Sequence, residues 1–246
     1  MKIITVPPRP KELKILNRRW PLAAYALYFL ASQPYSARIE HEKQLAEYFE
    51  KPAESKLVRN TFRKDLLREG LIHSKTTIYL RGVYSITMIR LSEKGNELCQ
   101  SFGWEICENE WQRLITRHSG DDQARHTASM IVFSLSARQR GWNVTMLPET
   151  NTPYFYPDLL LEKDNQKMYV EVELGSRKRE KWNLYRKMQG YVAVCGKTHW
   201  SRGSLIRECE EVPLGGFATD LQYLAEHRND PESPLWVEEW KCHEQS

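Results

Sequence analysis

The chain has 246 residues, of which 28% are charged and 41% hydrophobic, a composition typical of a folded protein of one or two domains and not of a disordered chain. No apolar run approaches the roughly 20 residues that a transmembrane helix needs. The basic start of the chain also lacks an apolar segment that ends in a cleavage site. We therefore expect a cytoplasmic protein, with its five widely spaced cysteines present as reduced thiols.

Charge is distributed unevenly along the chain. Residues 1–104 hold 18 Lys and Arg against 10 Asp and Glu, a net charge of +8, whereas residues 105–246 hold 18 against 22, a net charge of −4. A basic half suggests a polyanionic partner, and nucleic acid is the commonest polyanion inside a cell. We therefore expect the first half of the chain to contact nucleic acid.

The first structured elements are predicted to be two helices. Residues 1–19 are basic and contain three prolines, so we interpret them as an arm. A buried helix is predicted from Pro21 to just before Pro34, since proline fits the first turn of a helix and apolar residues follow it. A second helix through Leu45 ends before Pro52.

A third helix is predicted from Ser55, whose hydroxyl can cap it, to Arg68, with Gly70 closing it. One face of this helix is apolar every four residues, and the opposite face is basic and polar. Arg and Asn suit guanine and adenine edges, and Lys and Arg suit phosphates, so the polar face is a candidate DNA contact. The alternative is that this face is merely solvated. The apolar positions are Val58, Phe62 and Leu66, and the candidate DNA contacts are Lys56, Arg59, Asn60, Arg63 and Lys64.

Two β-prone runs, Leu71 to Leu80 and Val83 to Leu91, follow this helix and predict a hairpin. Leu91-Ser92-Glu93-Lys94-Gly95 then opens another helix. Three short helices, a hairpin and this segment together resemble the winged-helix family.

The winged-helix resemblance covers residues 20–103. In that family the third helix usually docks in the major groove of DNA and the hairpin contacts the backbone, which implies that Lys75 and Arg81 contact phosphates. Some winged helices bind protein instead, but the basic third helix favours double-stranded DNA as the partner.

The second half of the chain is predicted to begin after a polar linker at residues 105–120. A long helix follows from about Ala124 to Arg140, with Asp121-Asp122 as its cap and Gly141 at its end. Asn143 to Leu147 then predict a strand.

Two further strands, residues 156–162 and 168–175, carry acidic residues. If Asp164-Asn165 form a two-residue turn, Lys163 pairs with Gln166 and, counting back, Asp158 lies opposite Glu171. Glu173 shares the face of Glu171, because side chains alternate along a strand. A slip of one residue would change this arrangement.

Opposed carboxylates on adjacent strands destabilise a sheet unless a proton or a cation compensates them. Oxygen ligands favour Mg²⁺ or Mn²⁺, and such a cation can activate water and stabilise a phosphodiester transition state. We therefore interpret Asp158 and Glu171 as candidate metal ligands. The alternative is that Asp158 is a turn residue and that Glu171 and Glu173 alternate on a solvated strand face.

Pro157-Asp158 followed by Glu171-Val172-Glu173 resembles the core of the PD-(D/E)xK nucleases. The resemblance implies catalytic roles for the three acidic residues and a divalent metal ion as cofactor. Glu173 stands where that family usually has lysine, which leaves hydrolysis in question. A relocated lysine is known in the family, and Lys187 or Lys181 on the following helix could reach the site.

The stretch from His126 to Tyr191 is also similar to the replication-relaxation family of mobile-element proteins. The motifs that carry this similarity are Gly141-Trp142, Leu147-Pro148-Glu149, Pro157-Asp158, Glu171 to Ser176, and Lys187 to Tyr191. That family joins a winged helix to a nuclease-like domain. His126 is a candidate site residue, because many related nucleases carry one at the start of this helix, but a histidine in that place is more often simply exposed.

Two later segments are less specific. Ser176 to Gln189 predict a basic helix with Trp182 and Tyr185, either a phosphate-contacting surface or an exposed helix that balances the nearby carboxylates. A short helix is predicted at Ala218 to His227. The Trp-rich tail after Pro234 could pack on the body of the protein or on a partner.

The sequence therefore predicts an α+β winged helix followed by an α/β restriction-endonuclease-like PD-(D/E)xK domain. The boundaries are an arm at 1–19, the winged helix at 20–104, a linker at 105–120 and the nuclease-like domain at 121–246. One hypothesis is a metal-dependent DNA endonuclease or an accessory factor with that fold, of a mobile-element, replication or transfer type. The other is a DNA-binding regulator or scaffold with a degenerate nuclease domain. Protein partners in a DNA-processing complex and an oligomeric state fit both.

Overall fold

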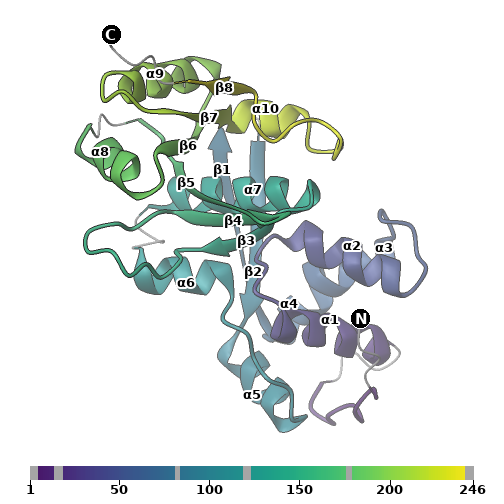
Figure 1. Cartoon of the computed structure of the whole chain (residues 1–246). Coiled ribbons are helices and arrows are strands. Elements are labelled where there is room, and N and C mark those ends of the chain that lie inside the picture. Colours follow the sequence, from purple (N-terminus) through teal and green to yellow (C-terminus); the bar gives the residue numbers. More distant parts are fainter. Residues whose placement is uncertain (1–4, 14–18, 81–83, 119–122, 176–178, 242–246) are drawn as a thin grey trace. The chain divides into compact units, whose positions relative to one another are not determined.

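The computed structural model describes residues 5–13, 19–80, 84–118, 123–175 and 179–241. The chain divides into two units, which are described separately. Unit 1 comprises residues 1–77 and 86–119, and unit 2 comprises residues 78–85 and 120–246. The fold is α+β, with helices, one two-stranded sheet and one six-stranded mixed sheet (Figure 1).

Unit 1 begins with the three predicted helices. They are α1 (Trp20–Ser32), α2 (Arg38–Tyr48) and a third helix built from α3 (Lys56–Asn60), the π-helical segment η2 (Thr61–Asp65) and α4 (Leu66–Arg68). The prediction that the Ser55 hydroxyl caps the third helix is wrong, because its side chain makes no capping hydrogen bond; its carbonyl oxygen instead accepts from the Arg59 amide at 3.0 Å. Gly70 ends the helix region with a φ of 70°, a conformation that glycine adopts without strain.

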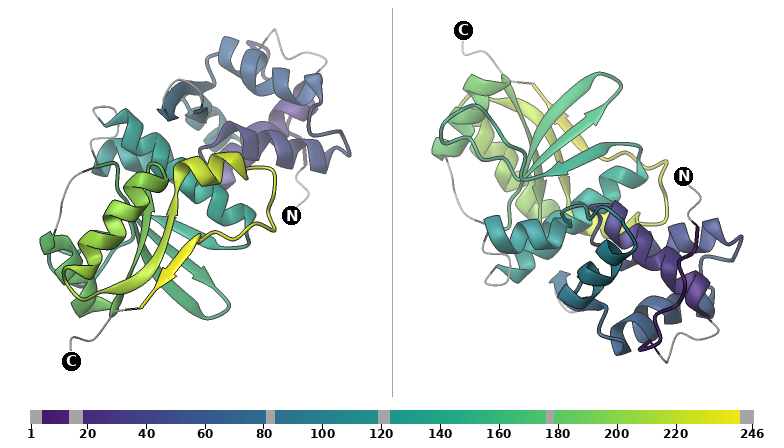
Figure 2. Two further views of the ribbon diagram at one scale, coloured as in Figure 1. Left: turned by 90° about the horizontal axis from the view of Figure 1, so that it is seen from above. Right: turned by 90° about the horizontal axis from the view of Figure 1, so that it is seen from below.

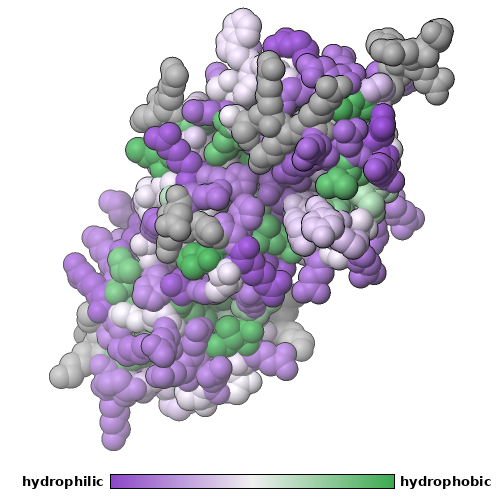
Figure 3. Space-filling view, turned by 90° about the vertical axis from the view of Figure 1, so that its left-hand side faces the viewer, coloured by the Kyte–Doolittle hydropathy of each residue, from purple (hydrophilic) through white to green (hydrophobic). Residues whose placement is uncertain are grey.

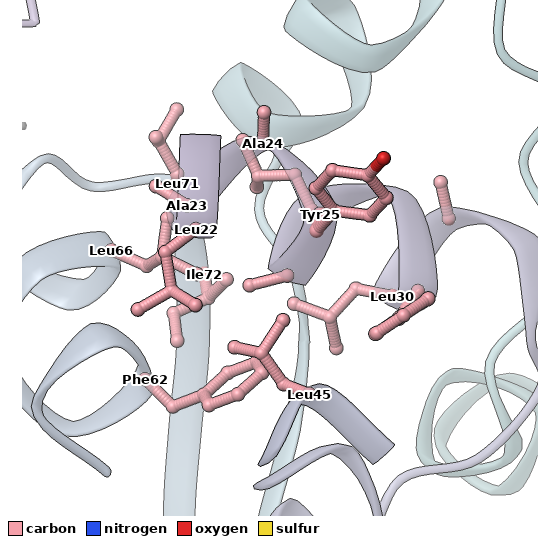
Figure 4. Close-up of a cluster of buried hydrophobic side chains, with 14 of the residues drawn as sticks. Leu22, Ala23, Ala24, Tyr25, Leu30, Leu45, Phe62, Leu66, Leu71 and Ile72 are labelled. Atoms are coloured by element: carbon pink, nitrogen blue, oxygen red, sulfur yellow. The ribbon is translucent and has the colours of Figure 1, made fainter. Parts of the chain in front are cut away.

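The core of unit 1 surrounds α1, most of which is buried. Side chains from the third helix, from α2 and from the start of the hairpin converge on it (Figure 4). Val58, Phe62 and Leu66 are at most 1% exposed, which confirms the predicted apolar face of the third helix. Their burial fixes which face of that helix remains available to a partner.

The predicted hairpin consists of β1 (Ile72–Leu80) and β2 (Tyr84–Leu91), and helix α5 (Glu93–Ser101) follows it. Ser92 caps α5, because its hydroxyl oxygen accepts a hydrogen bond from the Gly95 amide at 3.0 Å. The same hydroxyl donates to the Gly70 carbonyl oxygen at 2.6 Å. Ser92 thus ties the end of the third helix to the start of α5.

The segments expected as an arm and a linker pack against unit 1 in their described parts. In the first segment, Leu13 is 1% exposed, and the indole of Trp20 donates to the Pro7 carbonyl oxygen at 2.7 Å. The second segment contains helix α6 (Glu110–Arg117), whose N-cap Asn109 donates from its side-chain amide to the Tyr35 carbonyl oxygen at 2.9 Å. This hydrogen bond joins the region expected as a linker to the loop after α1.

Unit 2 is built on a mixed sheet in the order β3-β4-β5-β6-β7-β8 (Figure 1). Strands β3, β4 and β5 pair antiparallel, β5, β6 and β7 pair parallel, and β8 pairs antiparallel with β7. The strands are β3 (Asn143–Met146), β4 (Leu159–Lys163), β5 (Gln166–Val172), β6 (Tyr191–Gly196), β7 (Gly215–Asp220) and β8 (Glu238–Trp240).

Helices cover both faces of this sheet (Figure 2). They are α7 (Ala124–Gln139), α8 (Arg179–Met188), α9 (His199–Glu210) and α10 (Leu221–Glu226). Helix α7 follows the prediction, although its expected cap Asp121-Asp122 lies outside the described residues. Helices α8 and α9 pack on one face through a core that includes Trp182, Tyr185 and Val194.

The end of the chain completes the sheet. Residues 218–220 were expected to begin a helix, but they form the end of β7, and α10 begins only at Leu221 because Asp220 caps it. Arg140, at the end of α7, donates to the carbonyl oxygens of Ser233 and Asp230 at 2.8 and 3.3 Å. These bonds hold the turn that leads into β8, so the Trp-rich tail packs on unit 2 as far as it is described.

Hydrophilic residues predominate on the face drawn in Figure 3, and hydrophobic residues lie among them in small groups.

Among the described helices, none has both the length and the apolar character that crossing a bilayer requires. The four described cysteines, Cys99, Cys107, Cys195 and Cys209, are free thiols, as expected.

We predict that Gly95→Ala destabilises unit 1. A methyl group at this position would lie 2.1 Å from the Leu71 carbonyl oxygen, and that oxygen already accepts from the Ser92 amide at 3.0 Å. The backbone must therefore shift, at a cost of about 2 kcal/mol or more after the better helix propensity of alanine is allowed for. Urea unfolding measures the change. Glu97→Ala, at an exposed position of α5, is the matched control, and equal stability of the two variants would contradict the prediction.

Candidate functional site

The β4–β5 hairpin sets the positions of the acidic residues in unit 2. Asp164 and Asn165 have φ values of 48° and 66°, as a two-residue type I′ turn requires. Lys163 pairs with Gln166, as predicted, and the register runs on to Leu159 opposite Val170. One further step along this register places Asp158 across from Glu171.

Asp158 is held by the ends of three elements. Its carboxylate Oδ2 accepts a hydrogen bond from the Val172 amide at 2.8 Å, and its carbonyl oxygen accepts from the Leu147 amide at 2.9 Å. His126 Nε2, near the start of α7, lies 3.5 Å from Asp158 Oδ1. With 4% exposure, Asp158 is a buried, oriented carboxylate and not a solvated turn residue.

Glu171 lies deeper, at 1% exposure. The Tyr185 hydroxyl donates to Glu171 Oε1 at 2.7 Å, and the Lys181 ammonium contacts Oε2. Both partners come from α8, one helical turn apart, so a single helix supplies a hydrogen-bond donor and a positive charge to this carboxylate. The interpretation of Glu171 as one of a row of solvated strand residues is therefore wrong.

Glu173 lies just beyond the end of β5 and is 7% exposed. Its amide donates to the Cys195 carbonyl oxygen at 2.9 Å, which extends the pairing with β6 by one residue. Its carboxylate is close enough to Lys181 to help raise the pKa of that side chain. Asp158, Glu171, Glu173 and Lys181 together are called the carboxylate cluster below.

The two opposed carboxyl groups have divergent pKa values. Burial by itself would raise the pKa of Asp158, but the hydrogen bond with His126 and the charges of His126 and Lys181 lower it to about 2. The pKa of Glu171 is raised well above its usual value, first by burial and then by the charge of Asp158, despite Lys181 and Tyr185. Two neighbouring acids whose pKa values are shifted in opposite directions are typical of functional sites, although structural ion pairs also produce this pattern.

The lysine of α8 that contacts Glu171 is Lys181 and not Lys187. Lys187 is exposed, and six residues of helix turn its side chain by well over 90° from that of Lys181. Trp182 and Tyr185 were predicted to lie on a basic helix that either contacts phosphate or is exposed and balances the carboxylates. Both side chains are instead fully buried. The role of Tyr185 as a donor to Glu171 had no signal in the sequence other than its spacing of four from Lys181.

Other predicted residues lie as follows. His126 approaches Asp158, whereas Glu149 is exposed. In unit 1, Lys75 is half-buried on β1, and Arg81 lies outside the described residues.

The third helix presents its polar face as a surface. Lys56, Arg63 and Lys64 are exposed, and Arg59 and Asn60 are half-buried. Its middle is the π-helical segment η2, which contains Arg63 and Lys64. Short π segments are rare and recur at functional sites. A π segment also changes which side chains share a face. The prediction of one continuous α-helix from Ser55 to Arg68 is therefore wrong.

The chain was compared with known proteins in three ways. No family model matches it, and searches of curated proteins and of solved structures give no significant match.

We predict that Glu171→Gln alters the pH dependence of stability. A carboxyl group whose folded pKa is raised contributes stability below its unfolded pKa and loses it as pH rises through the folded pKa. The stability of the variant relative to the wild type should therefore increase from pH 5 to pH 9. We expect at least about 3 °C in relative Tm, which corresponds to about 1 kcal/mol in a protein of this size.

Differential scanning calorimetry over that range measures this change. Glu211→Gln, at an exposed position, serves as the control and should follow the wild type at every pH. A Glu171→Gln difference that is constant with pH, or that falls as pH rises, would contradict the burial of an acid with a raised pKa.

Proposed function

We propose that this chain is a DNA-binding protein in which unit 1 acts as a winged helix and unit 2 as a PD-(D/E)xK-like nuclease domain that hydrolyses phosphodiesters. The order of helices and hairpin in unit 1 and the order of helix, hairpin and helix in unit 2 support this proposal. Such a combination is similar to the replication-relaxation family. It suits a protein of a mobile-element, replication or transfer type.

One observation carries the proposal: a lysine from the next helix contacts a buried glutamate, and a buried aspartate lies across from that glutamate. Lys181 contacts Glu171, and its pKa is raised by Glu171, Asp158 and Glu173 in spite of its burial. This is the combination of groups that the nuclease resemblance implies, with the lysine relocated. Glu173 occupies the position where the family usually has lysine, but Lys181 still brings a positively charged side chain to the site.

The residues present fit a divalent cation. The cluster offers carboxylate oxygens, which Mg²⁺ and Mn²⁺ prefer as ligands. Asp158 and Glu171 would hold the ion. When bound there, it supplies charge stabilisation to a phosphodiester and lowers the pKa of a water molecule.

The remaining roles fall to the side chains of unit 2. Lys181 is placed to stabilise the negative charge that develops on the phosphate during hydrolysis. Tyr185 orients Glu171 through its hydroxyl, and the Val172 amide orients Asp158. His126 lies beside Asp158 and helps to keep it ionised.

A second candidate function is DNA binding without cleavage. It is favoured by Glu173 in place of the usual lysine and by the contact of Lys181 with Glu171, which can stabilise the fold without any metal. Unit 2 would then act as a scaffold in a DNA-processing complex, and unit 1 would provide the DNA contact.

We predict metal-dependent cleavage of plasmid or short duplex DNA, abolished by the double substitution Asp158→Asn, Glu171→Gln. Lys181→Ala should lower the cleavage rate about 100-fold, because a positive group placed at the developing charge contributes about that much. Lys187→Ala should cleave close to the wild-type rate, since this side chain is exposed.

Gel assays with Mg²⁺ and with Mn²⁺ measure these rates. Salt-sensitive DNA binding without cleavage by the wild-type protein would favour the scaffold. Cleavage that survives the double substitution would place the chemistry elsewhere.

We also predict that Lys56→Ala and Lys64→Ala each weaken duplex binding about fivefold and reduce the salt dependence by about one phosphate contact. Both lysines are exposed on the third helix. Fluorescence anisotropy at several salt concentrations measures both effects. Lys94→Ala removes the same charge from an exposed position on α5 and should bind like the wild type. Equal losses of affinity in all three variants would argue against a groove contact by the third helix.

A further inference from the structure

A buried acid lies beneath the polar face of the third helix. Glu42, on α2, is 5% exposed. Arg63 of the third helix donates to both of its carboxylate oxygens, from Nε at 3.0 Å and from Nη2 at 3.3 Å. Arg38, one turn earlier on α2, lies 3.1 Å from the same carboxylate.

These contacts gather two guanidinium groups around one carboxylate. Burial lowers the pKa of Arg38, the charge of Glu42 opposes this, and the charges of Arg63 and Arg59 lower it further. The three arginines and Glu42 carry a net charge of about +2. One buried acid thus holds together positive groups that would otherwise repel each other.

We propose that Arg38 and Arg63, both held by Glu42, form together with Arg59 on the third helix a binding site for a backbone phosphate of DNA. This inference rests on the proposed function of unit 1 and adds to it a residue of α2, Arg38, and a positioning residue, Glu42. Arg38 is outside the third helix, so its part in DNA binding does not follow from the polar face of that helix.

The accessibility of the arginines fits a ligand of this kind. The side chains of Arg38 and Arg63 are 23% and 42% exposed, whereas that of Glu42 is 6% exposed. The acid therefore lies on the protein side and the guanidinium groups reach solvent. A guanidinium whose Nε and one terminal nitrogen are bonded to a carboxylate still has other N–H groups to donate to a phosphate.

The π-helical backbone adds a second reason to expect a function here. Arg63 is the central residue of η2 (Thr61–Asp65). The helix accepts this unusual turn while Arg63 remains joined to Glu42, and Asp65 at its end is paired with Arg19 at 2.8 Å. The two hydrogen bonds to Glu42 thus fix the direction of the Arg63 side chain.

The main rival explanation is that Glu42 only joins α2 to the third helix. The two explanations predict opposite signs for Glu42→Gln. Removing a negative charge close to DNA should tighten binding by simple electrostatics. If Glu42 positions the arginines, the same change should weaken binding although the protein has become more positive.

Equilibrium binding of a fluorescent duplex to the full chain, measured from 50 to 200 mM salt, separates these outcomes. We expect Glu42→Gln to bind about tenfold more weakly, with a salt slope lower by about one contact. Arg38→Ala should show a similar loss. Lys43→Ala, an exposed position on α2, removes the same charge as Arg38→Ala and should have a smaller effect.

Circular dichroism confirms that each variant is folded before binding is compared. Unchanged or tighter binding by folded Glu42→Gln would overturn the positioning role, and an Arg38→Ala variant that binds like Lys43→Ala would remove Arg38 from the site. A Glu42→Gln variant that does not fold leaves Arg38→Ala to decide the question. If the wild-type protein does not bind duplex DNA at any of these salt concentrations, the proposed function of unit 1 fails together with this inference.

Discussion

Two carboxyl groups, those of Asp158 and Glu171, are buried beside each other at the end of a strand pair. The surrounding elements of unit 2 stabilise this arrangement. A sheet loses stability when like charges face each other about 5 Å apart. The cost is met by contacts from three directions: His126 from α7, the Val172 amide from β5, and Lys181 with Tyr185 from α8. The contacts with His126 and Lys181 lower the pKa of Asp158, whereas burial and the charge of Asp158 keep the pKa of Glu171 high. Two neighbouring acids with pKa values shifted in opposite directions are typical of a functional site.

Unit 1 also has a cluster of like charges that is held by a residue of opposite charge, but there the like charges are positive. There the crowded groups are guanidinium groups, and a single buried acid, Glu42, holds them. In each unit a helix supplies a positively charged side chain to an acid on another element: Lys181 of α8 contacts Glu171, and Arg63 of the third helix contacts Glu42. In both, loss of the partner should change function by releasing a charge, while the hydrophobic cores that position the elements stay the same.

Much of this could be predicted from local sequence. The type I′ turn at Asp164-Asn165 fixed the hairpin register, and the repeat of Val58, Phe62 and Leu66 fixed the buried face of the third helix. The choice of lysine could not be made, since Lys181 and Lys187 lie on one basic helix and only the burial of Trp182 and Tyr185 sets its rotation. Features that depend on contacts distant in sequence were also missed, namely α6, α9, β7 and β8, as was the π-helical turn η2. Helix α6 is strongly amphipathic and is capped by Asn109, so the sequence carried a signal for it that was missed. The other elements have no periodic pattern strong enough to stand out without the tertiary contacts that stabilise them.

The central claim is that Asp158 and Glu171 form a site for a divalent cation. Electron paramagnetic resonance of free Mn²⁺, titrated into the full chain, tests it without any need for turnover. The account predicts that the wild-type protein binds Mn²⁺ and that this binding is lost when Asp158 and Glu171 are replaced together by their amides. Binding that is equal in both proteins, or absent from the wild type at millimolar Mn²⁺, would contradict it and leave Lys181 as the permanent partner of Glu171.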